Sequence, residues 1–227
     1  MRVIGDRDLQ FLIDGLHARS EGQAPDLVRY FSARAEAGDL DWRSLDQEAN
    51  RYLADKMVAL EPAKAELCYL TCRALQAKCV VEVGTSFGVS TLYLAAAVRD
   101  NTAASGTRGV VIATEYEAAK AAAARANFTA AKLSELIDLR EGDLRETLRV
   151  IEGPVDFVLM DVWTEMVRPA IELIAPHLRP GSVVICDNTE QFAHGYEDYF
   201  AFVRDPANRL RTTTLPYAGG LEFTVRI

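Results

Sequence analysis

The segment Cys79-Val-Val-Glu-Val-Gly-Thr-Ser-Phe-Gly-Val-Ser90 joins a short β-branched run to a helical stretch through a turn that contains two glycines. The run 79–83 predicts a buried strand, and 90–98 predicts a helix. Gly84 and Gly88 let the backbone turn sharply and let a ligand approach closely. The helix points free N–H groups at the turn, where an anionic group is favoured. An ordinary tight turn fits this spacing equally well, because the third glycine of a dinucleotide fingerprint and the lysine of a P-loop are missing.

Short β-branched runs alternate with helical stretches in the rest of the chain. Strands are predicted over 109–114, 137–140, 155–161 and 182–187, and helices over 118–132, 144–151, 167–177 and within 195–203. This alternation predicts a mostly parallel sheet with helices on both faces, doubly wound by right-handed crossovers. The last two β-like runs, 210–215 and 221–227, leave no room for a helix between them, so they predict an antiparallel hairpin. The expected fold is α/β: a Rossmann-like, mostly parallel seven-stranded sheet with an antiparallel C-terminal strand.

The first sixty residues are charged and place apolar side chains at helical spacing, as at Leu9 and Ile13. They predict several helices joined by turns that contain glycine and aspartate. A stronger helix is expected over 62–76, with proline in its first turn. We therefore expect an N-terminal helical extension, 1–60, and a single globular unit, 61–227. The apolar stripes of the extension fit either a homodimer interface or a cover over the chain's own pocket.

The composition argues against several classes of partner. A formal net charge of −8 gives an acidic surface that repels the phosphate backbone, which argues against binding to nucleic acid duplexes. No run approaches the roughly 18 apolar residues of a membrane-spanning helix, and the N-terminus turns acidic too early for a secretory signal. We therefore expect a cytoplasmic protein that binds neither nucleic acid nor membrane. The four cysteines form no Cys-x-x-Cys pair and the three histidines are scattered, so buried, unbridged cysteines are expected and no zinc site is. The cysteines are Cys68, Cys72, Cys79 and Cys186.

An acidic residue follows the second predicted strand. Thr114-Glu115 comes about thirty residues after Gly84. A carboxylate at this strand end can accept both ribose hydroxyls of a nucleoside bound across the switch point of the sheet, although a surface glutamate that caps the next helix would look the same. Together with the glycine-rich turn, Glu115 favours a nucleoside-type ligand.

Two segments carry a resemblance to a known family. Val81-Glu-Val-Gly-Thr-Ser-Phe-Gly-Val-Ser-Thr91 is similar to the segment LEIGTxxGYST, and Leu215-Pro-Tyr-Ala-Gly-Gly-Leu221 resembles a final hairpin. The segment LEIGTxxGYST and this final hairpin are features of the class I S-adenosylmethionine-dependent methyltransferases. Within that group, the chain is most similar to the cation-dependent O-methyltransferases of the catechol and caffeoyl-CoA type. The resemblance runs from about Leu53 to the C-terminus. It implies transfer of a methyl group from S-adenosylmethionine to a hydroxyl of a small molecule.

The resemblance implies a role for each matching residue. Glu82 and Gly84 would border the methionine part of the cofactor, and Ser90 would hydrogen-bond the cofactor's carboxylate. Glu115 would hold the ribose, and Gly142-Asp143 would lie at the adenine.

A cation site is expected at the same edge of the sheet. Asp161 follows the fourth strand and Asp187-Asn188 the fifth, so the carboxyl ends of the strands can bring them together beside the cofactor. Such oxygen ligands suit a hard cation such as Mg²⁺, and in the resembled family Asp, Asp and Asn hold a cation that lowers the pKa of the substrate hydroxyl. The other interpretation is that Asp161 borders the cofactor pocket and the pair caps a turn. Trp163 matches an Asp-x-Trp segment and would pack near the cofactor.

One position departs from the family. The family has a lysine base three residues after the first aspartate, where this chain has Thr164, and threonine cannot replace that base at neutral pH. A metal alone could acidify the hydroxyl, His194 or Glu190 could act as the base, or the substrate is not a catechol. We predict Asp161 and His194 as catalytic residues, with an exposed loop histidine as the alternative. A metal-independent methyltransferase and a non-catalytic S-adenosylmethionine-binding protein are the other candidate functions.

Overall fold

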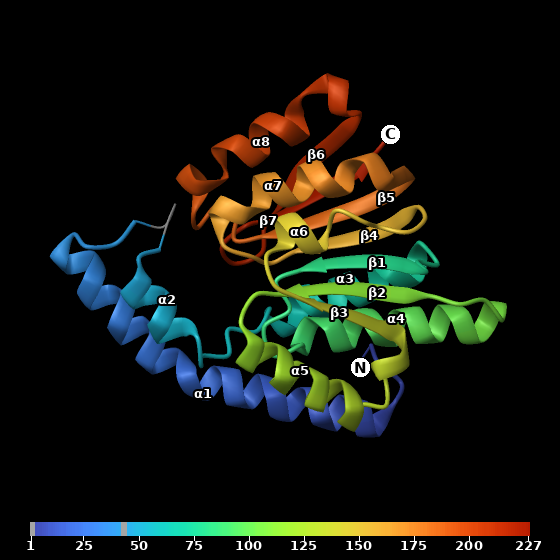
Figure 1. Ribbon diagram of the computed structural model, residues 1–227, viewed down its shortest axis with the longest axis horizontal. Helices are drawn as coiled ribbons and strands as arrows, with labels where there is room; N and C mark the ends of the chain where they lie inside the picture. The colour runs from blue at the N-terminus through green and yellow to red at the C-terminus, as the bar shows by residue number, and fades with distance from the viewer. Residues whose placement is uncertain (1–2, 42–44) are drawn as a thin grey trace.

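The computed structural model describes residues 3–41 and 45–227, which contain a seven-stranded sheet in the order β3-β2-β1-β4-β5-β7-β6 (Figure 1). Strands β1 to β5 pair in parallel, and β7 is antiparallel to both β5 and β6. The predicted fold class, including the final antiparallel hairpin, is confirmed. The strands are β1 Cys79–Val83, β2 Val110–Glu115, β3 Ile137–Glu141, β4 Val155–Met160, β5 Leu178–Asp187, β6 Leu210–Leu215 and β7 Leu221–Arg226.

The strand order reverses between β1 and β4. The chain adds β2 and β3 on one side of β1, then crosses back to place β4 and β5 on the other side. The pairing of Val83 with Met160 brings the ends of β1 and β4 level. Ligands of open α/β sheets bind at the carboxyl ends of the strands around such a reversal, so the segments that follow Val83 and Met160 define the expected site.

Helices cover both faces of the sheet. Alternate residues of β1 face opposite sides: Val80 joins a core cluster shared with α1, α3, α4 and α5, whereas Val81 and Val83 join a cluster shared with α6, α7 and α8. In Figure 1, α7 and α8 lie at the top and α1, α4 and α5 at the bottom. The helices are α1 Arg7–Ala37, α2 Gln47–Leu53, α3 Pro62–Ala74, α4 Val89–Ser105, α5 Ala118–Ala130, α6 Leu144–Thr147, α7 Thr164–Ile174 and α8 Glu197–Arg204.

The N-terminal region differs from the prediction. Instead of several helices joined by turns, it forms the single 31-residue helix α1, followed after a connection by α2. Gly15, Gly22 and Pro25 lie inside α1, and the helix ends only at Gly38, which adopts a left-handed φ of 74°. A glycine within a helix costs about 1 kcal/mol relative to alanine, a penalty that tertiary packing can offset.

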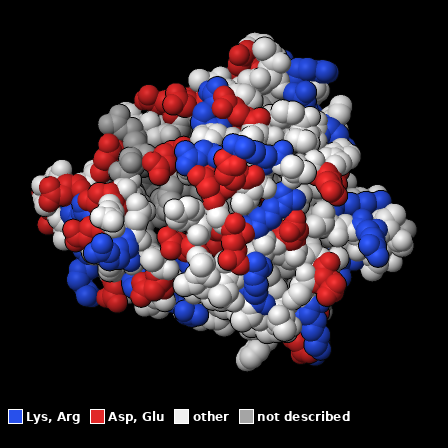
Figure 2. Space-filling view, viewed as in Figure 1, with Lys and Arg blue, Asp and Glu red and all other residues white. Residues whose placement is uncertain are grey.

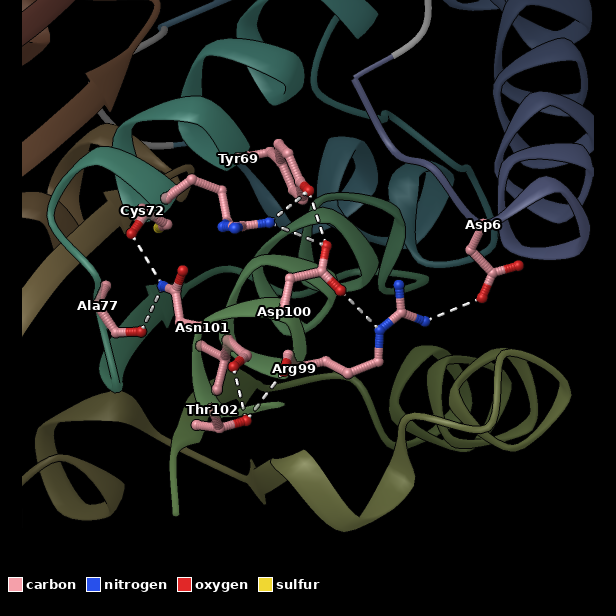
Figure 3. Close-up of polar contacts among 10 residues, drawn as sticks. Asp6, Tyr69, Cys72, Ala77, Arg99, Asp100, Asn101 and Thr102 are labelled. Atoms are coloured by element: carbon pink, nitrogen blue, oxygen red, sulfur yellow. Dashed lines mark hydrogen bonds and ion pairs between the residues drawn. The ribbon is translucent and has the colours of Figure 1, made fainter. Parts of the chain in front are cut away.

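That packing is visible on one face of α1. Leu9 and Ile13 are buried in the same core cluster as α4. The Asp6 side chain caps the helix by accepting a hydrogen bond from the Leu9 amide at 3.1 Å, and its other oxygen accepts from the Arg99 guanidinium of α4 at 2.9 Å (Figure 3). The division of the chain into 1–60 and 61–227, which also includes residues outside the described ranges, stays a prediction.

Polar contacts also join α3 to α4 (Figure 3). The Tyr69 hydroxyl donates to Asp100 at 2.7 Å. The Asn101 amide donates to the carbonyl of Cys72 at 3.0 Å and to that of Ala77 at 2.9 Å, just beyond α3. We call these contacts, together with the pair of Arg99 and Asp6, the α4 anchor. They fix α3, whose first turn reaches the site described below.

The cysteines and the surface agree with the composition. All four cysteines are free; Cys68, Cys72 and Cys186 are buried and Cys79 is half-buried. Within the described ranges, no helix has both the length and the apolar character required to cross a membrane. Figure 2 shows acidic and basic side chains interspersed over the visible face, without separation into large regions of one sign.

Candidate functional site

The glycine turn after β1 packs directly on the segment that leaves β4. Gly84 has φ +94°, and a Cβ added there would lie 2.0 Å from the carbonyl oxygen of Asp161. The Asp161 amide in turn donates to the carbonyl of Val83 at 2.9 Å. Gly88, with φ +82°, faces Phe128 of α5, whose ring would lie 2.4 Å from an added Cβ. Both glycines are therefore required by close packing as well as by backbone conformation.

Glu82 lies beneath this turn and has no exposed surface. Its carboxylate accepts hydrogen bonds from the hydroxyls of Ser90 at 2.6 Å, Thr85 at 3.2 Å and Thr91. Burial raises the pKa of Glu82 to about 7, although these hydrogen bonds favour its charged form. Ser90, predicted to bind the cofactor's carboxylate, thus donates a hydrogen bond from its hydroxyl to Glu82 in the structure.

Glu115 ends β2 and holds the glycine turn from the other side. One oxygen accepts from the amide of Ser86 at 2.6 Å, and the other accepts from the amide of Glu117 at 2.8 Å. A carboxylate offers about four acceptor positions, so two hydroxyl donors could still bind. The structure therefore places Glu115 where a carboxylate can both order the turn and accept hydrogen bonds from a ligand.

Asp143 and Trp163 lie at the same edge with more exposure to solvent. Gly142, with φ +117°, donates its amide to the carbonyl of Glu115 at 2.9 Å, which ties the loop after β3 to the end of β2. Asp143 caps α6 through the Arg145 amide at 2.9 Å, and its pKa is lowered chiefly by hydrogen bonds from the Arg145 side chain. Trp163 directly precedes α7 and is 41% exposed.

Asp161 and Asp187, both predicted as metal ligands, interact with each other and with a lysine that the sequence analysis did not select. The Lys64 ammonium of α3 lies 2.6 Å from Asp187 Oδ1. Burial raises the pKa of Asp161 well above its usual range, and the carboxylates of Asp187 and Glu82 raise it further, whereas Lys64 lowers it. Burial also raises the pKa of Asp187, against the hydrogen bond from Lys64. The structure thus brings two carboxylates and one ammonium group together.

The sequence carries a signal for Lys64. The residue occupies a buried position of α3 together with Cys68 and Cys72, four and eight residues further on. A lysine in register with a buried helical stripe is rarely fully buried without a partner. That partner, Asp187, is 123 residues away in the chain, so only the fold identifies it.

Asn188, the third predicted ligand, has a left-handed φ of 60°. Its amide nitrogen Nδ2 donates to Asp187 Oδ2 at 3.2 Å, and its backbone amide donates to Asp187 Oδ1 at 2.8 Å. Its side-chain oxygen faces Gly219, where an added Cβ would lie 2.8 Å away. The next hydroxyl, that of Thr189, is buried with no hydrogen-bond partner among the described residues.

His194 lies apart from these carboxylates. Its side chain is 93% exposed, and Nδ1 lies 3.4 Å from Glu197. The neighbouring Gly195 packs on Thr164 at the start of α7, and these residues line an open cavity of about 380 Å³. The structure therefore places His194 in the short 3₁₀ helix Ala193–Tyr196 with an exposed side chain, in agreement with the alternative of an exposed histidine, and among the described residues its polar contact is with Glu197.

Comparison with known proteins shows a similarity to methyltransferases. Residues 81–189 match the sequence model of a family described as "Methyltransferase domain". This segment is therefore similar in sequence to methyltransferase domains. A catechol O-methyltransferase from Niastella koreensis is 30% identical over 139 residues, which are 58% of this chain and 58% of that protein. A catechol O-methyltransferase from Mycobacterium tuberculosis is 30% identical over 132 residues, 58% of this chain and 57% of that protein. The matches therefore span less than two thirds of either relative.

A solved structure shares the fold of this chain. The O-methyltransferase from Bacillus cereus in complex with SAH superimposes with a TM-score of 0.67 at 21% identity, covering 79% of this chain and 88% of that one. The resemblance to methyltransferases of the catechol type is confirmed. The matched range includes Glu82, Glu115, Asp161 and Asp187, whereas Lys64 and His194 lie outside it.

Proposed function

We propose that the protein is an S-adenosylmethionine-dependent O-methyltransferase that acts on a hydroxyl of a small molecule. The observation that carries the proposal is the convergence of Gly84, Glu115 and Asp161 at the reversal point of the sheet, where the Gly84 backbone lies against Asp161 and Glu115 orders the turn. The names of the relatives and the SAH bound to the Bacillus cereus enzyme support it.

The residues present fit the cofactor. S-adenosylmethionine, when bound, supplies a methyl group on a positively charged sulfur. Glu115 would accept hydrogen bonds from the ribose, and the absence of a side chain at Gly84 would let the cofactor approach the backbone. Asp161 would provide negative charge near the sulfonium. The chain's main contribution would be alignment, because holding two reactants in line can supply several kcal/mol of the barrier lowering.

The acceptor oxygen would gain the methyl group while the bond between the methyl carbon and the sulfur breaks, S-adenosylhomocysteine would leave, and the hydroxyl proton would pass to water. The position of the family lysine, Thr164, supplies no base. His194 as a base stays a prediction, and its exposed position does not favour it.

The sequence analysis also predicted a divalent cation held by Asp161, Asp187 and Asn188. Two carboxylates and an amide have the right chemistry for Mg²⁺. As they stand, the residues do not fit one: both oxygens of Asp187 hold hydrogen bonds, the side-chain oxygen of Asn188 faces Gly219, and Lys64 lies 2.6 Å from Asp187. Among residues 3–41 and 45–227, no group of three or more His, Cys, Asp or Glu side chains is arranged to hold a metal. This geometry favours the second candidate, a metal-independent methyltransferase.

Two measurements test the proposed function. Calorimetric titration with S-adenosylmethionine should show binding, and no heat at millimolar cofactor would exclude the function. A panel of catechols, hydroxycinnamoyl esters and other phenols, followed by mass spectrometry for a gain of one methyl group, should identify an acceptor. Cofactor binding without transfer to any acceptor would favour a non-catalytic binding protein instead.

A further inference from the structure

Lys64 is one of the most deeply buried charged side chains of the protein. Its side chain is 2% exposed. Its ammonium group lies 2.6 Å from Asp187 Oδ1 and 3.8 Å from a carboxylate oxygen of Glu61, a residue whose side chain is 54% exposed. Lysine is almost never buried to this extent without a partner. The partner here is a carboxylate at the carboxyl end of β5, at the edge where the proposed function places its chemistry.

We propose that the Lys64 ammonium is the resident cation of this edge, in the place where Asp161, Asp187 and Asn188 would otherwise hold a divalent metal. The protein then binds neither Mg²⁺ nor Mn²⁺ there, and methyl transfer proceeds without metal. The statement on methyl transfer rests on the proposed function, whereas the statement on metal binding does not.

The coordination geometry supports this assignment. Mg²⁺ requires near-octahedral oxygen ligands at about 2.0–2.1 Å and gives up water reluctantly. Asp187 Oδ1 already receives the Lys64 ammonium and the Asn188 amide, and Oδ2 receives the Asn188 side chain. A metal bound to Asp187 would therefore lie against the ammonium group, and repulsion between them is strong in a buried site.

The charge balance leads to the same conclusion. Asp161 and Asp187 bring at most two negative charges, and Lys64 together with the sulfonium of the proposed cofactor brings two positive charges. Glu82 is at the midpoint of its titration near pH 7 because burial raises its pKa to about 7. A divalent cation would add two further positive charges, and the further carboxylate near Lys64, that of Glu61, is 54% exposed to solvent.

The position of Lys64 makes it a fixed part of the fold. It lies in the first turn of α3, after Pro62 at the helix start, and the α4 anchor holds this helix through Tyr69 and the carbonyl of Cys72. The long side chain of a surface lysine can swing away when a metal arrives, but the buried stem of Lys64 cannot do so without opening the core.

Electron paramagnetic resonance with Mn²⁺ on the full chain tests the proposal. Wild-type protein should leave millimolar Mn²⁺ free in solution. Lys64→Met removes the ammonium and keeps an unbranched apolar side chain, so it should gain a Mn²⁺ site that the additional change Asp161→Asn abolishes. Lys64→Arg, which keeps the charge, and Lys132→Met, which alters an exposed lysine, should gain none.

Two results would overturn the proposal: Mn²⁺ binding to the wild type that Asp161→Asn abolishes, or a folded Lys64→Met protein that gains no site. Because removal of Lys64 leaves a buried carboxylate unpaired, thermal melting with and without Mn²⁺ is a second readout. Mn²⁺ should raise the melting temperature of Lys64→Met but not that of the wild type, and the opposite result also contradicts the proposal. Failure to bind S-adenosylmethionine would exclude the proposed function while leaving the Mn²⁺ result valid.

Discussion

The α4 anchor and the carboxyl edge of the sheet both contain charged side chains, but they differ in charge balance. In the anchor, Arg99 pairs with Asp6 at 2.9 Å and with Asp100 at 3.0 Å, in positions where these side chains keep part of their contact with water. At the edge, one buried ammonium group faces a concentration of carboxylates. Glu82, Asp161 and Asp187 all have raised pKa values, with burial as the largest cause.

The difference shows which region is arranged for stability and which for a ligand. Partly exposed ion pairs contribute little to stability, about 0 to 1 kcal/mol each. The charges of the α4 anchor are balanced within the chain, so the anchor needs no ligand. Buried carboxylates with raised pKa values oppose folding, and such groups gather at functional sites. An excess of negative charge is useful where a cationic ligand binds, which agrees with a sulfonium cofactor.

The largest effect expected from one substitution is at the edge. Gly84→Ala would place a Cβ 2.0 Å from the Asp161 carbonyl at φ +94°, so the β1 turn must move away from β4. We expect a loss of about 4 kcal/mol or more in the free energy of unfolding, the range of severe packing defects, and loss of S-adenosylmethionine binding. Urea unfolding and calorimetry measure these effects.

Gly38→Ala is the matched control. Gly38 also has a left-handed conformation, with φ +74°, but an added Cβ would meet nothing within 4 Å among the residues that the structure describes. It should therefore show only the backbone penalty, about 1 kcal/mol. If both variants lost the same stability, close packing of Gly84 on Asp161 would not explain the requirement for glycine.

The second prediction compares the two regions directly. Lys64→Met should lower the free energy of unfolding by about 3 kcal/mol without metal, because it leaves the buried Asp187 unpaired. Arg99→Met, which breaks the partly exposed contact with Asp6, should lower it by about 1 kcal/mol or less. Urea unfolding at pH 7 checks both, and equal losses would remove the distinction between the regions.

Much of the fold could be predicted because it depends on local pattern. The apolar run 79–83 and the later β-branched runs specified strands, and the two glycines located the turn at the reversal point. Helix α1 could not be predicted, since Gly15, Gly22 and Pro25 are local signals for a break. They are overridden by contacts of α1 with residues much later in the chain, such as that of Asp6 with Arg99.

The candidate site shows the same limit. Motif resemblance pointed to Glu82, Glu115 and Asp161, which lie at strand ends and therefore converge in any fold of this topology. It could not identify the pairing of Lys64 with Asp187, because α3 carries no motif and contact depends on how the helix packs. It left open whether His194 is a base or an exposed histidine, and the side chain is 93% exposed.

The third prediction concerns pH. Glu82 has its pKa raised from 4.5 to about 7 in the folded protein, so the folded state binds a proton more tightly than the unfolded state does. The contribution of Glu82 to stability is therefore fully present below about pH 4.5 and is lost as pH rises through 7, by roughly 3 kcal/mol at most. Glu82→Gln should remove this part of the pH dependence and should unfold at higher urea concentration than the wild type at pH 8. Identical pH profiles of the two proteins would contradict the assignment.

The smallest effect concerns Glu115, where the edge is expected to contact the cofactor. Glu115→Gln keeps the size of the side chain and two acceptor positions but removes the charge that strengthens hydrogen bonds from ribose hydroxyls. We expect S-adenosylmethionine to bind about tenfold more weakly, which corresponds to about 1.4 kcal/mol. Unfolding should also become easier, because the amide of Ser86 or Glu117 would face the NH₂ group of the glutamine. Glu141→Gln is the control, because Glu141 pairs with Glu115 in the sheet register but its carboxylate is bonded to Arg125 on the surface. Calorimetric titration compares the two variants: equal affinities would show that the charge of Glu115 does not contribute to cofactor binding.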